Sequence, residues 1–153
     1  MLNKTSAKSF KGRPVIPGTL PPTRAVVSRQ GVNTLASFQK SAMMSKKTVI
    51  CSDQNNSDLY NKDITGAALC LPQTIGSTTG GMVLFTACAM GITPAAMLFS
   101  QTIDSLAAAG VILSDVWTDN TIVAVDRLGD EFLHYVQDGM MVSVSPDGVV
   151  TVK

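Results

Sequence analysis

The apolar residues of this chain gather in short runs, which polar and glycine-rich stretches separate. "RPVI" and "TRAVV" near the N-terminus, and "GAALCLP", "PAAMLFS" and "TIVAVD" further on, are short and unbroken, which is typical of strands. Near the C-terminus, "MMVSV" and "VVTV" alternate apolar and polar residues on either side of a Pro-Asp-Gly turn. This last pattern predicts a β-hairpin.

Two longer apolar segments in the middle of the chain have the start and stop signals of helices. "STTGGMVLFTACAMG" begins with hydroxyl residues that can cap a helix and ends at Gly91, which suits the position after a last turn. "DSLAAAGVILSDV" begins with Asp104 or Ser105 as the capping residue. The first segment lies between two predicted strands, which would make a right-handed strand–helix–strand unit if the strands are parallel. A further segment, "NTLASFQKSAMMSKK", fits either a short helix or a loop over the core.

The order of these elements predicts an α/β fold with mixed strands and two central helices. We expect a single domain over residues 1–153, because this length supplies one core and no internal repeat is present. Residues 1–12 are predicted to be loose. Residues 51–63 are dense in Asn and Asp, which predicts a surface loop.

Composition and charge narrow the classes of function. The formal net charge is +1, so the chain has neither the strongly basic character of a nucleic-acid-binding protein nor an acidic tail. The N-terminal residues lack the apolar segment of a secretory signal, and every long apolar stretch is interrupted before it could span a bilayer. We therefore expect a soluble, cytoplasmic protein with reduced thiols, which binds no nucleic acid and no membrane.

The residues that commonly hold metals are few and scattered. Cys51, Cys70 and Cys88 are widely spaced, and no CxxC pair occurs. Cys70 and Cys88 lie in apolar segments, so we expect their side chains to be buried. His134 is the single histidine, which argues against a site of several histidines. We predict that this chain by itself binds no metal and no cofactor.

The segment "PQTIGSTTGG" at residues 72–81 is the strongest candidate for a functional site. Gly76 and Gly81 have the spacing of a phosphate-binding P-loop, but the Lys and the hydroxyl residue that should follow are missing. The dinucleotide fingerprint GxGxxG is absent as well. A GxSxG nucleophile elbow does not fit, since Ser77 directly follows Gly76. These three kinds of site are therefore excluded.

A helix start in this segment suggests a different chemistry. The backbone N–H groups of a first helical turn have no partner within the helix, and together with the helix dipole they favour an anion. Glycine lets a ligand approach the backbone closely, and hydroxyl residues add donors. The residues that could serve in this way are Gly76, Ser77, Thr78, Thr79, Gly80 and Gly81. An ordinary capped helix after a tight turn explains the same pattern, and both interpretations stay open.

The order of segments from "DLYNKD" to "AAAGVIL" resembles the small-subunit, or swivel, domain of the aconitase X family. That family has a Leu/Ile-x-Gly before an apolar strand, then a Pro and a Gly-Ser loop, an apolar helix that ends in Gly, a Pro-x-Ala strand and an Asp-x-x-x-Ala-x-Gly helix. The matching residues are Ile64 to Gly66, Pro72, Gly76 to Thr79, Gly91, Pro94 to Ala96, and Asp104 with Ala108 and Gly110. "KGRPVIPG" and "DGMMVSVSPDGVVTV" look like the family's first and last strands, so the resemblance covers most of the chain.

This resemblance implies a function and a partner. It implies a swivelling β/β/α domain that serves as the small subunit of a heteromeric hydro-lyase and is inactive alone. The large catalytic subunit of such an enzyme carries the cysteines that hold iron or an iron–sulfur cluster. Known activities of the family are dehydration of cis-3-hydroxy-L-proline and of mevalonate 5-phosphate. The segment from Trp117 to Lys153 looks more like that of bacterial members, which mostly act on cis-3-hydroxy-L-proline, and this likeness favours that substrate here.

The resemblance also implies roles for the residues of the loop. The family's proposed proton acceptor falls on Ser77, and Gly76, Thr78 and Thr79 would contact the small carboxylate substrate. Three departures bear on the substrate. "ASFQKSAMM" stands in place of a Ser-Phe-x-Gly-Gly-Val-Asp stretch, "SDLYNKD" lacks a His-Pro, and the loop reads Ser-Thr-Thr-Gly where the family has a serine run. The alternatives are a domain that binds an anion without turnover and a purely structural partner.

Several large apolar residues have no evident role in this scheme. We expect the pairs Met43–Met44 and Met140–Met141 to fill the core, although they could also line a subunit interface. Trp117 is expected in the core or at an interface rather than as a stacking platform for a ligand.

Overall fold

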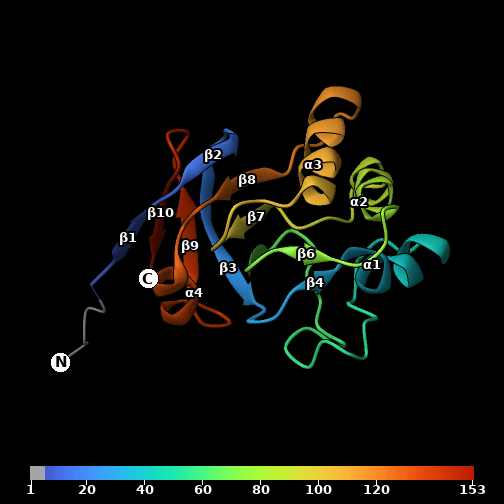
Figure 1. Cartoon of the computed structure of the whole chain (residues 1–153), viewed down its shortest axis with the longest axis horizontal. Helices are drawn as coiled ribbons and strands as arrows, with labels where there is room; N and C mark the ends of the chain where they lie inside the picture. Colours follow the sequence, from blue (N-terminus) through green and yellow to red (C-terminus); the bar gives the residue numbers. More distant parts are fainter. Residues whose placement is uncertain (1–5) are drawn as a thin grey trace.

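The computed structural model describes residues 6–153 and has a mixed α/β architecture (Figure 1). One sheet is formed by β1 (Lys8–Lys11), β2 (Arg13–Ile16), β3 (Leu20–Val27), β5 (Ala68–Leu71), β7 (Ala96–Phe99), β8 (Val123–Asp126), β9 (Met141–Val144) and β10 (Val149–Val152). Its eight strands follow the order β1-β10-β9-β3-β5-β7-β8-β2. Neighbours among β3, β5, β7 and β8 are parallel, and the other pairs are antiparallel. The predicted α/β class with mixed strands is thus confirmed.

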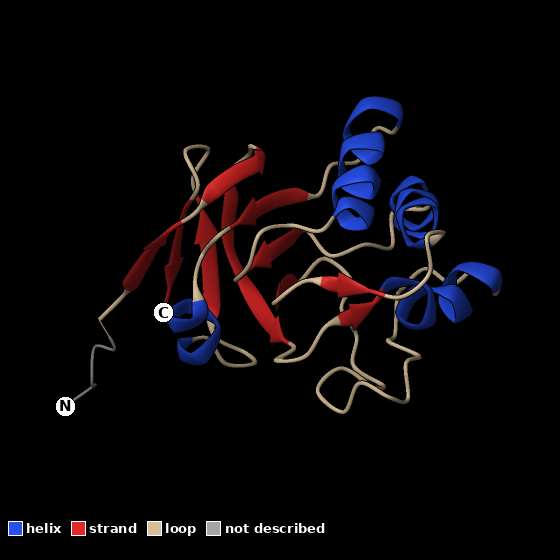
Figure 2. Ribbon diagram, viewed as in Figure 1, coloured by secondary structure: helices blue, strands red, loops and turns tan. Residues whose placement is uncertain are grey.

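The two ends of this sheet meet at Gly12. Strands β1 and β2 stand at opposite ends of the strand order, yet Gly12 alone separates them in the chain. The sheet therefore curls round until it is nearly closed (Figure 2). Gly12 N–H donates to the carbonyl of Gly148 at 2.9 Å. A Cβ on Gly12 would lie 2.5 Å from a side-chain carbon of Val125, so this close approach requires glycine.

Part of the N-terminal segment is more ordered than the sequence predicted. A loose start is predicted over residues 1–12, of which residues 1–5 lie outside the described residues. Lys8–Lys11 instead forms β1 and pairs with β10. The reason is the burial of Phe10, whose ring packs edge-on against Phe132 with the ring centroids 5.4 Å apart. One apolar residue in a polar run gives no periodic signal from which a strand could be predicted.

Four helices and a second, two-stranded sheet complete the described fold. The helices are α1 (Thr34–Met43), α2 (Gly80–Ala89), α3 (Ser105–Trp117) and α4 (Asp130–Tyr135). Ahead of α1 and α2, β4 (Val32–Asn33) and β6 (Thr74–Ile75) pair in parallel. The prediction of two central helices is confirmed by α2 and α3. The segment that forms α1 was compatible with either a helix or a loop, and α4 was not predicted. With six residues, α4 is too short for a helical period to appear in the sequence.

The central strand–helix–strand unit agrees with the prediction from sequence. β5 and β7 pair in parallel, with Leu69 opposite Met97, and α2 connects them. Asp104 caps α3, since its Oδ2 accepts a hydrogen bond from Ala107 N–H at 3.1 Å. Gly91 follows α2 with a φ of +73°, the left-handed conformation that glycine readily adopts after a helix. β9 and β10 form the predicted hairpin.

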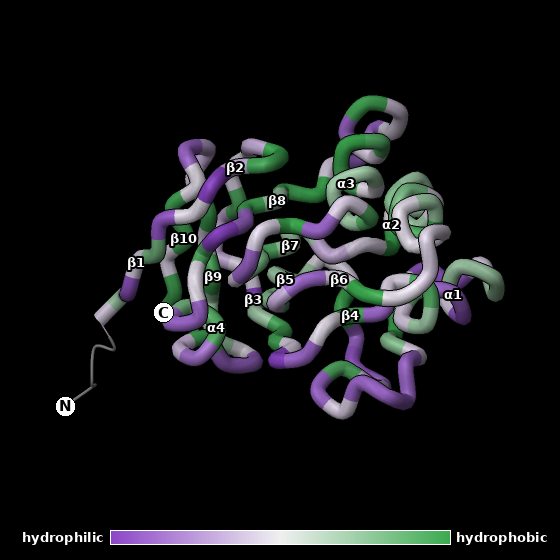
Figure 3. The backbone as a smooth tube through the Cα atoms, viewed as in Figure 1, coloured by the Kyte–Doolittle hydropathy of each residue, from purple (hydrophilic) through white to green (hydrophobic). Residues whose placement is uncertain are grey.

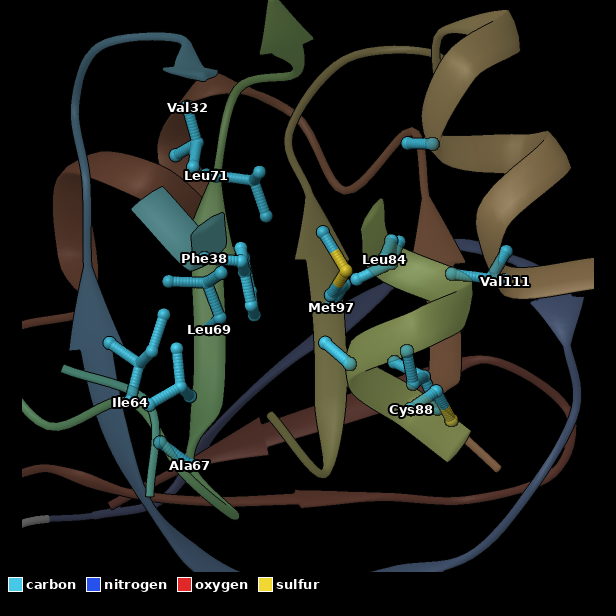
Figure 4. Packing of buried hydrophobic residues seen from close by; sticks show 14 of the residues in the cluster. Val32, Phe38, Ile64, Ala67, Leu69, Leu71, Leu84, Cys88, Met97 and Val111 are labelled. Atoms are coloured by element: carbon cyan, nitrogen blue, oxygen red, sulfur yellow. The ribbon is translucent and has the colours of Figure 1, made fainter. Parts of the chain in front are cut away.

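The sheet carries a hydrophobic core on each of its faces. The inner core lies within the curled sheet, where strand residues such as Val142 pack against Phe132 of α4. The outer core, part of which Figure 4 shows, lies under α1, α2 and α3 and includes Phe38. Because successive strand residues face opposite sides, β5 contributes Leu69 to the outer core and Cys70 to the inner one. Figure 3 shows apolar residues along these strands and hydrophilic ones in the loop that precedes β5.

Several large apolar side chains are exposed, which contradicts an expectation from sequence. Met43, Met44 and Met141 are 75%, 56% and 41% exposed, so they do not fill the core. Met140 is partly buried against the inner core. Trp117, the last residue of α3, is 74% exposed and lies outside the core as well. None of the helices within residues 6–153 has the length and apolar character needed to cross a lipid bilayer.

Candidate active site

The loop at residues 76–79 connects β6 to α2, and all four of its residues are exposed. Gly76 has a φ of +105°, which a residue with a side chain rarely adopts. A Cβ on Gly76 would also lie 2.7 Å from the side-chain nitrogen of Asn33. The shape of the loop is therefore fixed both by the conformation of this glycine and by a neighbouring side chain from β4.

Ser77 begins the turn that leads into α2. Its Oγ lies 3.0 Å from Thr79 Oγ1 and accepts a hydrogen bond from Thr79 N–H at 3.3 Å. The carbonyl of Ser77 accepts a second bond, from Gly80 N–H at 3.0 Å. Thr78 is exposed between these residues. The Ser77 hydroxyl is thus held in one place while it stays accessible from solvent.

The first turn of α2 presents backbone donors that no protein group uses. Thr79 precedes the helix, and its side chain makes no capping bond to the first turn. Within the described part of the chain, Gly81 N–H and Met82 N–H donate to no protein acceptor. Donors of this kind, at the positive end of a helix dipole, favour an anion. The helix start predicted from sequence is present, and its geometry is suited to a carboxylate or a phosphate.

The N-terminal ends of α1 and α3 lie beside this loop. A Cβ on Gly80 would be 3.5 Å from the Cβ of Thr34, the first residue of α1. A Cβ on Gly81 would be 2.9 Å from the carbonyl oxygen of Leu106, in the first turn of α3. The two glycines therefore allow three helix starts to come together. Sequence reasoning did not find this cluster, because its members come from three distant parts of the chain.

Two polar side chains that the sequence analysis gave no role in the site fix the arrangement. Asn33 caps α1 by accepting a bond from Ala36 N–H at 3.0 Å, while its side chain lies against Gly76. Asp104 accepts bonds from Thr74 N–H at 2.8 Å and from Thr74 Oγ1 at 2.5 Å, which ties β6 to the start of α3. An Asn directly before a helix is a start signal that could have been recognised from sequence. The bond between Asp104 and Thr74 could not.

The carboxylate of Asp126, at the end of β8, has a structural role. It is fully buried, and Arg13 donates to its two oxygens at 2.9 and 2.7 Å. Ile103 N–H donates a third bond at 2.8 Å. Burial by itself would raise the pKa of Asp126, but these hydrogen bonds and the charges of Arg13 and Arg127 lower it. Arg127 has a φ of +57° and donates from Nε to Thr102 Oγ1 at 3.3 Å.

The cysteines do not form a metal centre. Cys51, Cys70 and Cys88 are free and buried, and burial raises the pKa of the Cys70 thiol. Within residues 6–153 no three His, Cys, Asp or Glu side chains are grouped so that they could hold a metal ion. Among the residues that the structure describes, no ligand set is therefore grouped for the iron or iron–sulfur cluster that the resemblance assigns to a partner chain.

Comparison with known protein families agrees with the fold. The family model described as the aconitase X swivel domain matches residues 9–152. The chain belongs to the aconitase X swivel-domain family. This result confirms the resemblance that was drawn from the order of segments in the sequence.

Two solved structures share the fold of this aconitase X swivel domain. The crystal structure of Thermococcus kodakaraensis aconitase X in its holo-form is 25% identical in sequence, with a TM-score of 0.78 over 95% of this chain and 98% of that chain. The solution NMR structure of a UPF0107 protein is 21% identical, with a TM-score of 0.74 over 95% of this chain and 99% of that chain. At this lower identity the second likeness concerns the fold alone.

A curated relative matches part of the swivel domain. Over 86 residues the chain is 34% identical to the phosphomevalonate dehydratase small subunit of Methanocella arvoryzae. The match takes in 56% of this chain and 60% of the relative. The chain thus spans less than two thirds of the length of that relative.

Proposed function

We propose that this chain is the small subunit of an aconitase X-type dehydratase, which removes water from a small hydroxy acid. Membership of the aconitase X swivel-domain family supports the class of protein. The observation that carries the proposal is the placement of Ser77, whose hydroxyl is exposed beside the free backbone donors of α2. A proton acceptor next to a binding site for a carboxylate is what this dehydration requires.

Ser77 is the proposed proton acceptor. Dehydration breaks a C–H bond next to the substrate carboxylate and a C–O bond on the neighbouring carbon, and the electron pair of the C–H bond becomes the new double bond. To accept the proton, the Ser77 hydroxyl must first give its own to a base. The loop at residues 76–79 holds no base, so we assign this role to the large subunit. The resulting alkoxide is unstable in water. Thr79 N–H, 3.3 Å from Ser77 Oγ, and the positive end of the α2 dipole would stabilise that alkoxide.

The rest of the site would be divided between this chain and a partner. Gly76, Thr78 and Thr79 are the proposed contacts of the substrate carboxylate, together with the free N–H groups of the first turn of α2. The loop holds no acid that could protonate the departing hydroxide. We assign this role to a large catalytic subunit, and the name of the Methanocella relative, a small subunit, supports the existence of such a partner.

Two substrates are candidates for this reaction. The name of the Methanocella relative supports mevalonate 5-phosphate. The resemblance of the C-terminal strands to those of bacterial members of the family, which mostly act on cis-3-hydroxy-L-proline, favours that substrate. Both molecules carry a hydroxyl group on the carbon β to a carboxylate, so the same proton and hydroxide transfers apply to each.

Co-expression with the large aconitase X subunit of the same genome tests the proposed function. The purified pair and each chain alone would be assayed with cis-3-hydroxy-L-proline and with mevalonate 5-phosphate. We expect the pair to dehydrate one of the two acids and each isolated chain to be inactive. A stable pair that converts neither acid would contradict the proposed activity.

A non-catalytic role is the second candidate, because Ser77 also has a local structural function. Its Oγ accepts the Thr79 N–H bond and so stabilises the turn before α2. In that case the chain would support a large subunit without contributing a reacting group. Replacement of Ser77 would then lower stability and leave turnover unchanged.

A further inference from the structure

A hollow of about 540 Å³ lies between the C-terminal half of α1 and the loop at residues 46–61. A second hollow of about 460 Å³ adjoins it, since Lys40, Met44 and Ser52 line both. We call the two hollows together the α1 groove. None of the four residues of the Ser77 loop lines it.

Exposed apolar side chains surround the α1 groove. Met44, Ile50 and Tyr60 line the first hollow, and they are 56%, 38% and 40% exposed. Met43 lines the second hollow and is 75% exposed. Their exposure rules out ordinary core filling, which was the expectation for the methionine pair. Flexible methionine side chains are instead common at surfaces where proteins bind one another.

The α1 groove also carries positive charge without a counter-charge. Lys40 and Lys46 line it, and Lys47 follows directly in the chain. Among residues 6–153, none of these three lysines pairs with a carboxylate, whereas Lys8 and Lys62 do. The lining of both hollows contains neither Asp nor Glu. An occupant that fits must therefore bring carboxylates together with apolar side chains.

The α1 groove lies within reach of a partner that covers the Ser77 loop. The start of α1 adjoins that loop, because Gly80 lies beside Thr34. α1 has ten residues and is therefore about 15 Å long. Figure 1 shows α1 and α2 at the end of the molecule that is far from β1 and β10. An ordinary interface buries about 800 Å² on each partner, a patch roughly 30 Å across, and this width exceeds the length of α1 that separates the loop from the far end of the groove.

We propose that the α1 groove docks the large subunit of the dehydratase. A segment of that subunit places carboxylates against Lys40 and Lys46 and an apolar side chain against Met43 and Met44. The proposal rests on the proposed function, which already requires a second chain over the Ser77 loop. In this proposal the α1 groove binds the large subunit, and the Ser77 loop takes part in dehydration of the substrate.

Charge reversal in the groove provides the first test. The variant Lys40→Glu/Lys46→Glu would be titrated with the large aconitase X subunit of the same genome by isothermal titration calorimetry. We expect its Kd to rise roughly 10-fold or more, with the difference from the wild type shrinking at high salt. The matched control is Lys153→Glu at the C-terminal end of the chain. Lys153 is exposed and forms no ion pair with any residue from 6 to 152, and the Kd of this variant should equal the wild-type value.

Replacement of an apolar side chain in the groove gives a second test that does not depend on charge. Met43→Ser is paired with Trp117→Ser, because the two side chains are 75% and 74% exposed and lie on different helices. Met43→Ser should raise the Kd several-fold, and Trp117→Ser should leave it unchanged. Thermal unfolding of each variant, and turnover with the large subunit at saturation, should match the wild type, because the groove does not contact substrate.

The outcomes distinguish the groove from the proposed function. If the wild-type pair forms and dehydrates its substrate but the groove variants bind as tightly as their controls, the docking proposal is wrong and the function stands. If the wild-type chain does not bind the large subunit, both are wrong. Concentration-dependent self-association of the wild-type chain that the groove variants abolish would identify a second copy as the occupant and would also overturn the proposal.

Discussion

The inner and outer faces of the eight-stranded sheet are covered in different ways. Inside the curled sheet, strand side chains pack against one another and against α4. On the outer face α1, α2 and α3 cover the strands. The candidate site belongs to the outer side, where it is formed by the starts of these helices and not by the sheet.

Because the two faces are covered differently, the inner core and the outer layer depend on different features of the sequence. The inner core requires apolar volume and closure of the sheet at Gly12. The outer layer requires the helices to approach closely at one end, which Gly80 and Gly81 allow. A change in the inner core should therefore affect stability alone, whereas a change near the helix starts should affect both stability and turnover.

The largest expected effect comes from truncation of a buried ring in the inner core. Phe132→Ala removes a fully buried ring and should lower the free energy of unfolding by about 3–5 kcal/mol. Turnover per folded molecule should not change, since α4 lies on the inner side of the sheet. Urea unfolding and turnover of the dehydratase pair measure the two quantities.

The matched variant for the outer core is Phe38→Ala in α1, where the ring is also fully buried. Its loss of stability should be similar, but turnover should fall as well, because the start of α1 adjoins the loop at residues 76–79. Equal effects of Phe132→Ala and Phe38→Ala on turnover would contradict the separation of the two regions.

The ion pair between β2 and β8 should make stability depend on pH. Because the pKa of Asp126 is lowered in the folded protein, its stabilising contribution is complete above the ordinary carboxyl pKa of about 4 and is lost as the pH falls through the lower folded value. Asp126→Asn should therefore destabilise the protein by about 1.5–3 kcal/mol at pH 7 and progressively less below pH 4. Thermal unfolding at pH 7, 5 and 3 measures this, and a difference that is independent of pH would contradict it.

A smaller effect is expected where α2 approaches α3. Gly81→Val places a side chain where even a Cβ would lie 2.9 Å from the carbonyl oxygen of Leu106, so the helices must move apart. We expect a loss of about 1–3 kcal/mol in stability together with reduced turnover. Thr86→Ala, at an exposed position of the same helix, should change stability by about 0.5 kcal/mol at most. Unchanged turnover in a folded Gly81→Val protein would show that the packing of α2 on α3 does not position the loop.

The sequence predicted the elements that have a local signal. β5, β7 and β8 are unbroken apolar runs, and α2 and α3 have clear start and stop residues such as Asp104 and Gly91. β1 and α4 could not be predicted, because their apolar residues, among them Phe10, face the inner core without forming a periodic pattern. Closure of the sheet also depends on a contact between distant residues, Gly12 and Gly148.

The candidate site was predictable only in part, because some of its contacts also join residues that are distant in the chain. Glycine and hydroxyl residues in one segment indicated the Ser77 loop. The contact of Asn33 with Gly76 joins residues far apart in the chain, and no local pattern records it. The sequence favours a core position for the Met43–Met44 pair, and only the exposure of these side chains in the fold rules that position out.

Turnover of the Ser77→Ala variant, paired with the large subunit, tests the central claim most directly. The claim is that the outer side of the sheet supplies a reacting group and not only a folded partner. Turnover should fall about 10²–10⁴-fold, the usual effect of removing a general base, while the Kd for the large subunit stays close to the wild-type value. Loss of the bond from Thr79 N–H to Ser77 Oγ should lower the free energy of unfolding by no more than about 0.5–1.5 kcal/mol, which leaves the protein folded. Thr86→Ala on the same helix should retain full turnover. A folded and paired Ser77→Ala protein with wild-type turnover would contradict the claim.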